Sequence, residues 1–211
     1  MMSRFEHITR YLDDVGSLLS SLPPQPIDDI IDALLTAHRY GRTVYIIGNG
    51  GSAATASHFA CDLQKWTITP NQRRFRALAL TDNTPVFSAW ANDDGYEHVF
   101  EQQLYALLNP GDVVVAISGS GRSPNVVRAV RYAAAHGAIT IGLTGYEGGD
   151  LLRLTDHCLV VPSDRMNQIE DVHMTLCHLI ADVIRQALAQ PAETSTVFPP
   201  ALTLHIGASS A

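Results

Sequence analysis

The sequence predicts an α/β fold: a three-layer, doubly wound sandwich with a five-stranded parallel sheet of the flavodoxin-like kind. Five short apolar runs, several of them rich in valine and isoleucine, alternate with longer stretches of helical periodicity. Several of these runs are apolar at nearly every position, which is typical of parallel strands covered on both faces. The predicted strands span residues 43–47, 76–80, 112–117, 138–143 and 157–161.

Helical periodicity predicts two helices before the first strand and five after it. The first two lie within residues 3–41, are separated by the proline-rich stretch 21–26, and should form a helical hairpin outside the sheet. We expect residues 1–190 to form a single domain and residues 191–211 to form a poorly ordered tail. The later helices are predicted at 52–65, 84–91, 95–108, 124–136 and 167–190.

The composition excludes several classes of protein. With a net charge of −7, the chain lacks the excess of basic residues that is typical of nucleic-acid-binding proteins. The chain has thirteen arginines but only one lysine, Lys65. Schiff-base chemistry is therefore disfavoured, because it would depend on that single lysine. Three scattered cysteines favour a reduced, cytoplasmic setting. No signal-peptide core is visible, and no apolar run approaches the roughly eighteen residues of a membrane span.

The stretch 43–62 predicts a buried strand, a tight glycine turn and a helix. Gly48, Gly50 and Gly51 permit close backbone approach, and Ser52 is the predicted N-cap of the helix. Amides at such a helix start can bind an anion. On the emerging helix, His58 and Asp62 are four residues apart and therefore share one face.

A second strand-to-helix turn carries the sequence SGSGRSPN at 118–125. Its hydroxyls, backbone amides and helix N-terminus can surround a phosphate dianion without a lysine. The plainer interpretation is a Gly/Ser turn capped by Ser123, with Pro124 at the first helical position. Its place after an apolar strand, paired with the glycine turn, favours phosphate binding. A third irregular stretch, 66–75, contains Arg73 and Arg74, which are either a solvated surface or a substrate-facing lid.

From about residue 5 to 188 the chain resembles the SIS (sugar isomerase) domain family, and within it the phosphoheptose isomerases. The serine loop marks only the broad superfamily, whereas the segments around His58/Asp62 and Glu170/His178 are more specific. The motifs that carry the resemblance are GNGGS at 48–52, HFACD at 58–62, AND at 91–93, SGSGRS at 118–123 and IEDVHMTLCH at 169–178.

The resemblance implies roles for particular residues. Asn49, Gly50, Gly51 and Ser52 match the turn that faces the sugar. Sugar-hydroxyl binding is implied for Asn92 and Asp93, and phosphate binding for Ser118, Gly119, Ser120 and Ser123. The positions that bind zinc, transfer protons or do both in such isomerases are His58, Asp62, Glu170 and His178, with Asp62, Glu170 and His178 as the catalytic candidates.

The implied activity is isomerisation of sedoheptulose 7-phosphate to D-glycero-D-manno-heptose 7-phosphate, with one Zn²⁺ per subunit, no nucleotide cofactor, and a homotetramer with sites at subunit boundaries. Two positions depart from the family pattern. Asp62 stands where glutamate is common, and Glu170 stands where glutamine is common. These departures leave open which carboxylate is the base and which sugar phosphate is used.

Plainer interpretations exist for the other features. A single histidine is more often a packed or surface residue than a ligand, so we predict structural roles for His7, His38, His136 and His205. His98 is undecided, and His173, three residues after Glu170, is a reserve ligand. Glu170 and His178 are eight residues apart, or roughly 12 Å along a helix, so they serve either one site or two.

Two other functions compete. The stretch 48–53 satisfies a loose G-x-G-x-x-A dinucleotide pattern, but no acidic residue follows about 20 positions later at the end of the second strand. A non-catalytic sugar-phosphate-binding regulator would need the serine loop but no acid–base residues. The presence of His58, Asp62, Glu170 and His178 favours an enzyme.

Overall fold

The computed structural model describes residues 2–190 and contains a five-stranded, fully parallel sheet. The strand order is β2-β1-β3-β4-β5, the doubly wound arrangement that the sequence predicted. Each strand agrees with its prediction to within one residue at either end. The strands are β1 (Thr43–Gly48), β2 (Arg76–Ala79), β3 (Val113–Ser118), β4 (Ile139–Thr144) and β5 (His157–Val160).

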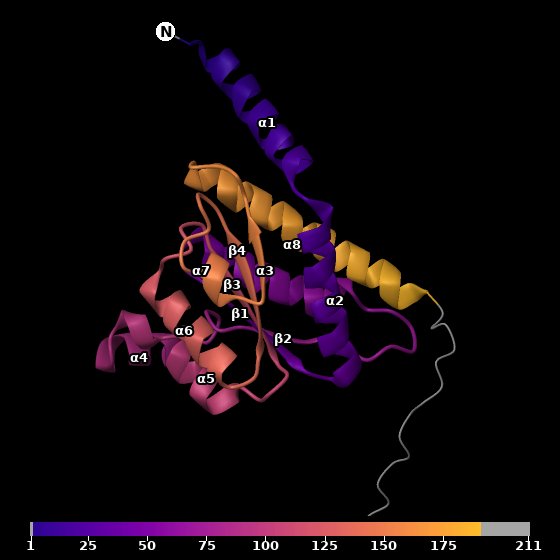
Figure 1. The fold of residues 1–211 in the computed structure, drawn as a ribbon, viewed down its shortest axis with the longest axis vertical. Helices are drawn as coiled ribbons and strands as arrows, with labels where there is room; N and C mark the ends of the chain where they lie inside the picture. The colour runs from indigo at the N-terminus through magenta and orange to yellow at the C-terminus, as the bar shows by residue number, and fades with distance from the viewer. Residues whose placement is uncertain (1, 191–211) are drawn as a thin grey trace, which may run out of the picture.

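The two central strands explain the three layers. Strands β1 and β3 are buried at every position, and their side chains alternate between two hydrophobic cores. Val44 and Ile46 face the core beneath α2 (Pro24–Tyr40), α3 (Gly51–Cys61) and α8 (Met166–Ala189). Tyr45 and Ile47 face the core beneath α5 (Glu101–Leu107), α6 (Pro124–Ala135) and α7 (Leu151–Leu154) (Figure 1).

Four local features differ from the predictions. The helix expected at 52–65 changes at Asp62 into a π-helical turn, Asp62–Trp66. The helix expected at 95–108 is divided into a 3₁₀ turn, Tyr96–His98, and α5, which begins at Glu101. No helix was predicted where the short helix α7 forms. The helix at 84–91 is longer than expected and forms α4 (Thr84–Asp93).

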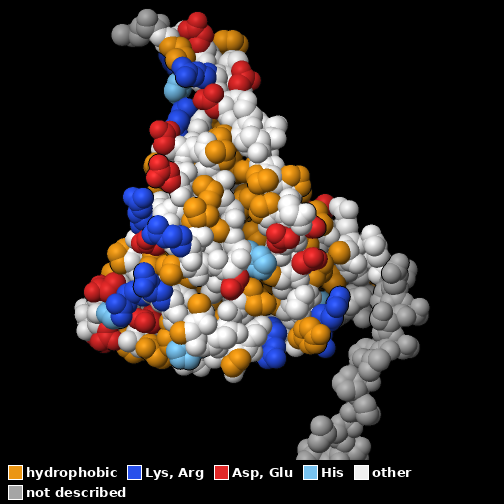
Figure 2. Space-filling view, in the orientation of Figure 1, with side chains coloured by type: hydrophobic (Ala, Val, Ile, Leu, Met, Phe, Trp, Pro, Cys, Tyr) orange, Lys and Arg blue, Asp and Glu red, His pale blue; other side chains and the backbone are white. Residues whose placement is uncertain are grey.

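The N-terminal helix α1 (Arg4–Ser21) does not fold back along α2 as a hairpin but extends away from the body (Figure 1). A capping box between Ser3 and Glu6 starts it. It contacts α8, where the Tyr11 hydroxyl donates to Asp171 and Arg165 pairs with Asp14. None of its residues is buried. Figure 2 shows hydrophobic side chains gathered where α1, α2 and α8 meet, among them Leu19, Leu22, Ile27, Leu179 and Val183.

The helix that follows β1 covers one face of the sheet and the helix that follows β3 covers the other. The chain therefore leaves the carboxyl ends of these adjacent strands in opposite directions, which opens a crevice of the kind that binds ligands in doubly wound folds. Among residues 2–190, no helix is long and apolar enough to cross a membrane. The predicted tail at 191–211 lies outside the described residues.

Candidate active site

The glycine turn at the end of β1 is shaped by close backbone contacts. A Cβ on Gly48 would stand 2.7 Å from the Ser52 carbonyl oxygen, and Gly50 has a φ of +55°. Helix α3 begins one residue earlier than predicted, with Gly50 as its N-cap. Ser52 is therefore not the N-cap; it lies within the first turn and is buried at 5% exposure.

The serine loop follows β3 and keeps polar groups available for a ligand. Ser118 Oγ lies 3.3 Å from Ser123 Oγ, and Ser120 Oγ accepts a hydrogen bond from the Arg122 amide at 3.3 Å. Ser123 is the N-cap of α6, as predicted, but its hydroxyl makes no capping bond. Two hydroxyls and a free helix N-terminus therefore converge at one point, which suits an oxyanion.

Two asparagines join the two turns. The amides of Asn49 and Asn125 bond reciprocally, at 2.9 and 2.8 Å, and the Tyr96 hydroxyl donates to Asn49 at 2.9 Å. A hollow of about 650 Å³ opens here between the carboxyl ends of β1 and β3. It is lined by Asn49, Tyr96, Glu97, Ser123, Pro124, Asn125, Val127 and Arg128.

The sequence interpretation missed Asn125 and Tyr96. Asn125 is the last residue of the SGSGRSPN stretch, so its position could have drawn attention, whereas no sequence signal marks Tyr96. Conversely, Asn92 and Asp93 are exposed on the last turn of α4, hydrogen-bond to each other and do not line this hollow.

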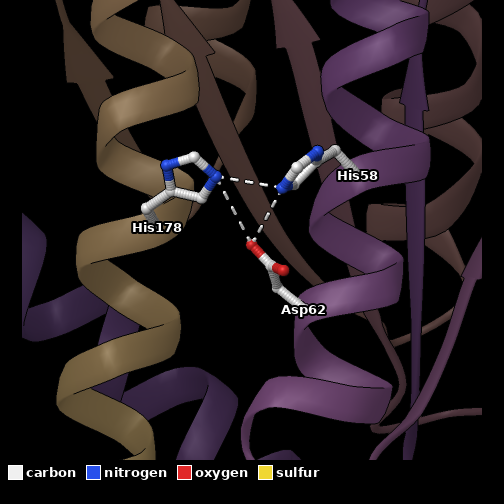
Figure 3. A group of neighbouring side chains, drawn as sticks. All are labelled: His58, Asp62 and His178. Atoms are coloured by element: carbon white, nitrogen blue, oxygen red, sulfur yellow. Dashed lines mark hydrogen bonds and ion pairs between the residues drawn. The ribbon is translucent and has the colours of Figure 1, made fainter.

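Farther along α3, His58 and Asp62 meet His178 of α8 (Figure 3). The Nε2 atoms of His58 and His178 are 2.9 Å apart, and each lies near Asp62 Oδ2, at 3.5 and 3.8 Å. Cys177, next to His178 in the sequence, takes no part. Burial, and secondly the charge of Asp62, raise the pKa of its thiol, so the thiol stays protonated.

Glu170 is not part of this cluster. Its carboxylate lies over the start of α3, where a Cβ on Gly51 would stand 2.6 Å from Glu170 Cδ. Helices α3 and α8 run in the same direction, because Glu170 faces Gly51 while His178, two turns later, faces His58 and Asp62. The eight-residue spacing therefore separates a carboxylate at the glycine turn from a histidine deeper along the helices.

His173, the reserve ligand, faces the sheet instead. It is 1% exposed, and its Nε2 lies 3.1 Å from the Thr144 carbonyl oxygen, to which it donates. Its Nδ1 has no hydrogen-bond partner among residues 2–190. Burial lowers the pKa of His173 to about 4, so the ring is neutral at pH 7 and has a structural role.

This buried ring should make the metal-free protein sensitive to acid. Because the pKa falls from its unfolded value of 6.5 to about 4 on folding, the unfolded state binds more protons between these pH values. The free energy of unfolding should fall by about 2 kcal/mol from pH 7 to pH 5 through this group alone. Urea unfolding with chelator at both pH values measures the loss. His173→Gln, which keeps a donor for Thr144, should not show this part of the fall in unfolding free energy. An equal fall in the variant would refute the role of His173.

Several other predictions concern residues away from the site. His38 is 5% exposed and lies 2.8 Å from the Arg73 carbonyl oxygen, which confirms its structural role. His136 bonds to the Tyr132 carbonyl, and His98 pairs with Glu101. The Arg73 guanidinium lies beside Gly41, just before the start of β1. The serine loop follows the carboxyl end of β3, so Arg73 lies at the opposite end of the strands and does not cover that loop. His205 lies outside the described residues.

The donor set of the cluster fits a zinc ion. Two imidazole nitrogens and a carboxylate oxygen form a common three-ligand set for catalytic zinc. The candidate ligand atoms all lie within 4.8 Å of one another. With zinc bonds of about 2.0–2.2 Å, atoms at such spacings can share one ion and leave a fourth position for a water or substrate.

Comparison with known proteins places this site in a family. The SIS domain family matches residues 10–145. A phosphoheptose isomerase from Aquifex aeolicus is 35% identical over 190 residues, which is 90% of this chain and 99% of that protein. The chain belongs to the phosphoheptose isomerases of the SIS domain family.

Two solved structures of phosphoheptose isomerases are similar to this chain in fold and sequence. Phosphoheptose isomerase GmhA from Neisseria gonorrhoeae superposes with a TM-score of 0.81 at 32% identity, covering 87% of this chain and all of that one. The phosphoheptose isomerase from Francisella tularensis gives 0.81 at 30% identity over 88% of this chain and all of that one. The predicted resemblance and fold are confirmed, and the protein is an isomerase.

Proposed function

We propose that this phosphoheptose isomerase converts sedoheptulose 7-phosphate to D-glycero-D-manno-heptose 7-phosphate through an enediol, in a pathway that makes activated heptose. The observation that carries the proposal is the cluster in which His58 and Asp62, from the helical segment that follows the glycine turn, meet His178 of α8. A carboxylate and two imidazoles provide the acid and base that a sugar-phosphate-binding regulator would not need.

The two turns divide the substrate between them. The phosphate binds Ser118, Ser120 and Ser123 together with the N-terminus of α6, because dianionic oxygens suit free hydroxyls and amides. The sugar chain extends along the glycine turn at Asn49 toward α3 and α8. Binding energy at the phosphate then orients the reacting carbons, which costs less entropy than a free encounter.

Isomerisation moves one proton from C1 of the ketose to C2 and another between the two oxygens. We assign proton transfer at carbon to Asp62 and proton transfer at oxygen to His178, whose Nε2 lies 3.8 Å from Asp62 Oδ2. No electron acceptor is needed, because the substrate's own carbons exchange oxidation states. Glu170, beside Gly51, remains the alternative base.

We further propose that zinc binds His58, Asp62 and His178. When bound, zinc would polarise the carbonyl and stabilise the enediolate. His58 would then serve only as a ligand, whereas Asp62 and His178 would each combine the role of ligand with a role in proton transfer. Metal analysis of protein purified without chelator tests this assignment.

We also propose a cytoplasmic homotetramer with sites at subunit boundaries. Helix α1 supports this, because it exposes Phe5, Ile8 and Leu12 while extending from the body. A second copy is the simplest cover for that apolar face. Light scattering should give a tetramer mass, and Phe5→Glu with Leu12→Glu should reduce it.

Incubation with sedoheptulose 7-phosphate, followed by NMR, tests the function. The aldose anomeric proton should appear with time. Binding of the sugar phosphate without turnover, with or without added Zn²⁺, would instead favour a regulator. Turnover of a pentose or hexose phosphate alone would keep the chemistry and change the substrate.

Ser123→Ala should raise KM for the sugar phosphate by about 10- to 100-fold, because a hydrogen bond to a charged group contributes roughly 1.5–3 kcal/mol. The kcat should change less than threefold, since the reacting end is bound elsewhere. Steady-state kinetics measure both constants. Ser88→Ala, which removes an exposed hydroxyl on α4, is the control. An unchanged KM would place the phosphate elsewhere.

A further inference from the structure

The helix that carries His58 and Asp62 changes its winding at Asp62. Helix α3 ends at Cys61, and the chain continues in helical backbone through the π turn Asp62–Trp66. The Thr67 amide donates to the Asp62 carbonyl at 3.2 Å, a bond that spans five residues. Such wide turns are rare, and they occur frequently at functional sites. This one begins at the carboxylate of the cluster.

The turn is attached to its surroundings on several sides. Leu63 is fully buried, and Gln64 Nε2 donates to the Ala77 carbonyl of β2 at 2.7 Å. The Trp66 ring lies beneath the Arg185 guanidinium, with 4.4 Å between Cζ and the ring centroid. Arg185 lies on α8, two turns beyond His178. The wide turn is therefore fixed both to the sheet and to the helix that carries His178.

Thr67 closes the turn from within. Its side chain is only 4% exposed, and its hydroxyl donates to the Leu63 carbonyl at 2.6 Å, while its amide holds the Asp62 carbonyl. One residue thus bonds to the carbonyls of both Asp62 and the residue after it. In an α-helix the Thr67 amide would donate to the Leu63 carbonyl, but in the wide turn it donates to Asp62 instead. The Thr67 hydroxyl supplies the donor that the Leu63 carbonyl would otherwise lack.

Backbone position matters greatly for a side chain as short as aspartate. Asp62 has only two side-chain torsions, so its carboxylate cannot compensate for a displaced Cα. Its Oδ2 lies 3.5 and 3.8 Å from the two imidazole nitrogens, and the side chain is 18% exposed. We propose that Thr67 is a positioning residue that fixes the π turn and thereby aims the Asp62 carboxylate at His58 and His178.

The test compares Thr67→Val, which lacks the hydroxyl, with Thr67→Ser, which keeps it. The first readout is the ¹⁵N chemical shifts of the His58 and His178 imidazoles in metal-free protein. Thr67→Val should move them, and Thr67→Ser should restore them. Zinc affinity, measured by competition with a chromogenic chelator, should fall at least about tenfold in Thr67→Val, as for other residues that orient metal ligands. The kcat should fall about tenfold with KM within twofold.

Thr155→Val is the matched control, because the Thr155 hydroxyl also bonds to a carbonyl four residues earlier, Leu151, but at the end of α7. It should lower Tm without moving the imidazole shifts. If Thr67→Val also lowers only Tm, Thr67 is merely structural and the inference is wrong. The kinetic readout rests on the proposed function. If the wild-type protein turns over no sugar phosphate, that function fails while the imidazole shifts still decide the inference.

Discussion

Asp62→Asn is expected to lower kcat by about a thousandfold, because asparagine keeps the shape of the side chain but cannot accept the substrate proton at neutral pH. General acid–base groups typically contribute about 10²- to 10⁴-fold to the rate. His178→Ala should have an effect of similar size, since its Nε2 belongs to the same cluster. KM should change only a few fold in both variants, because the phosphate is held by the serine loop.

Asp29→Asn is the control for this prediction. Asp29 accepts a hydrogen bond from Gln25 four residues earlier on α2 and is not a member of the cluster. Its loss should leave kcat unchanged. If Asp62→Asn keeps a rate within tenfold of the wild-type protein, the base is not Asp62, and Glu170→Gln becomes the informative variant.

Gly121→Ala should destabilise the protein by about 2–4 kcal/mol. Gly121 has a φ of +62°, and a Cβ there would stand 2.7 Å from the Gly148 carbonyl carbon and 3.2 Å from Gly149 Cα. Both obstacles are backbone atoms, so relief requires moving two loops. Backbone strain and overpacking each cost roughly 1–3 kcal/mol. Urea unfolding measures the loss.

The same change should weaken phosphate binding, because the Gly121 amide bonds to the Ser118 carbonyl and its own carbonyl accepts from Asp150 and Leu151. Gly16→Ala is a matched control. Nothing lies within 4 Å of a Cβ at that position within α1, so alanine should stabilise the helix by about 0.5–1 kcal/mol. A stable Gly121→Ala protein with normal sugar-phosphate affinity would contradict the described loop geometry.

The sheet could be predicted from the sequence because parallel strands buried on both faces are continuously apolar. The runs at 43–47 and 112–117 show this most clearly, and both became central strands. The direction of α1 could not be predicted, because helical periodicity says nothing about where a helix lies. The π turn at Asp62 was also hidden, since the residues around it are compatible with an ordinary α-helix.

The candidate site was predicted only where neighbours in sequence are also neighbours in space. His58 and Asp62 share a helix face at four-residue spacing, so their pairing was visible in advance. Their meeting with His178 depends on α3 and α8 running side by side, which the resemblance implied and the spacing did not. Tyr96 reaches Asn49 through a turn started by Gly95, and that contact depends on tertiary structure alone.

Isomerisation in D₂O tests most directly whether Asp62 transfers the proton at carbon. The wild-type protein is incubated with sedoheptulose 7-phosphate, and deuterium at C2 of the aldose is followed by NMR. Deuterium should be incorporated at C2 as the aldose forms, and both should be lost in Asp62→Asn, which should still bind the sugar phosphate. Unchanged aldose formation and deuterium incorporation in Asp62→Asn would contradict the assignment of the cluster as the centre of reaction.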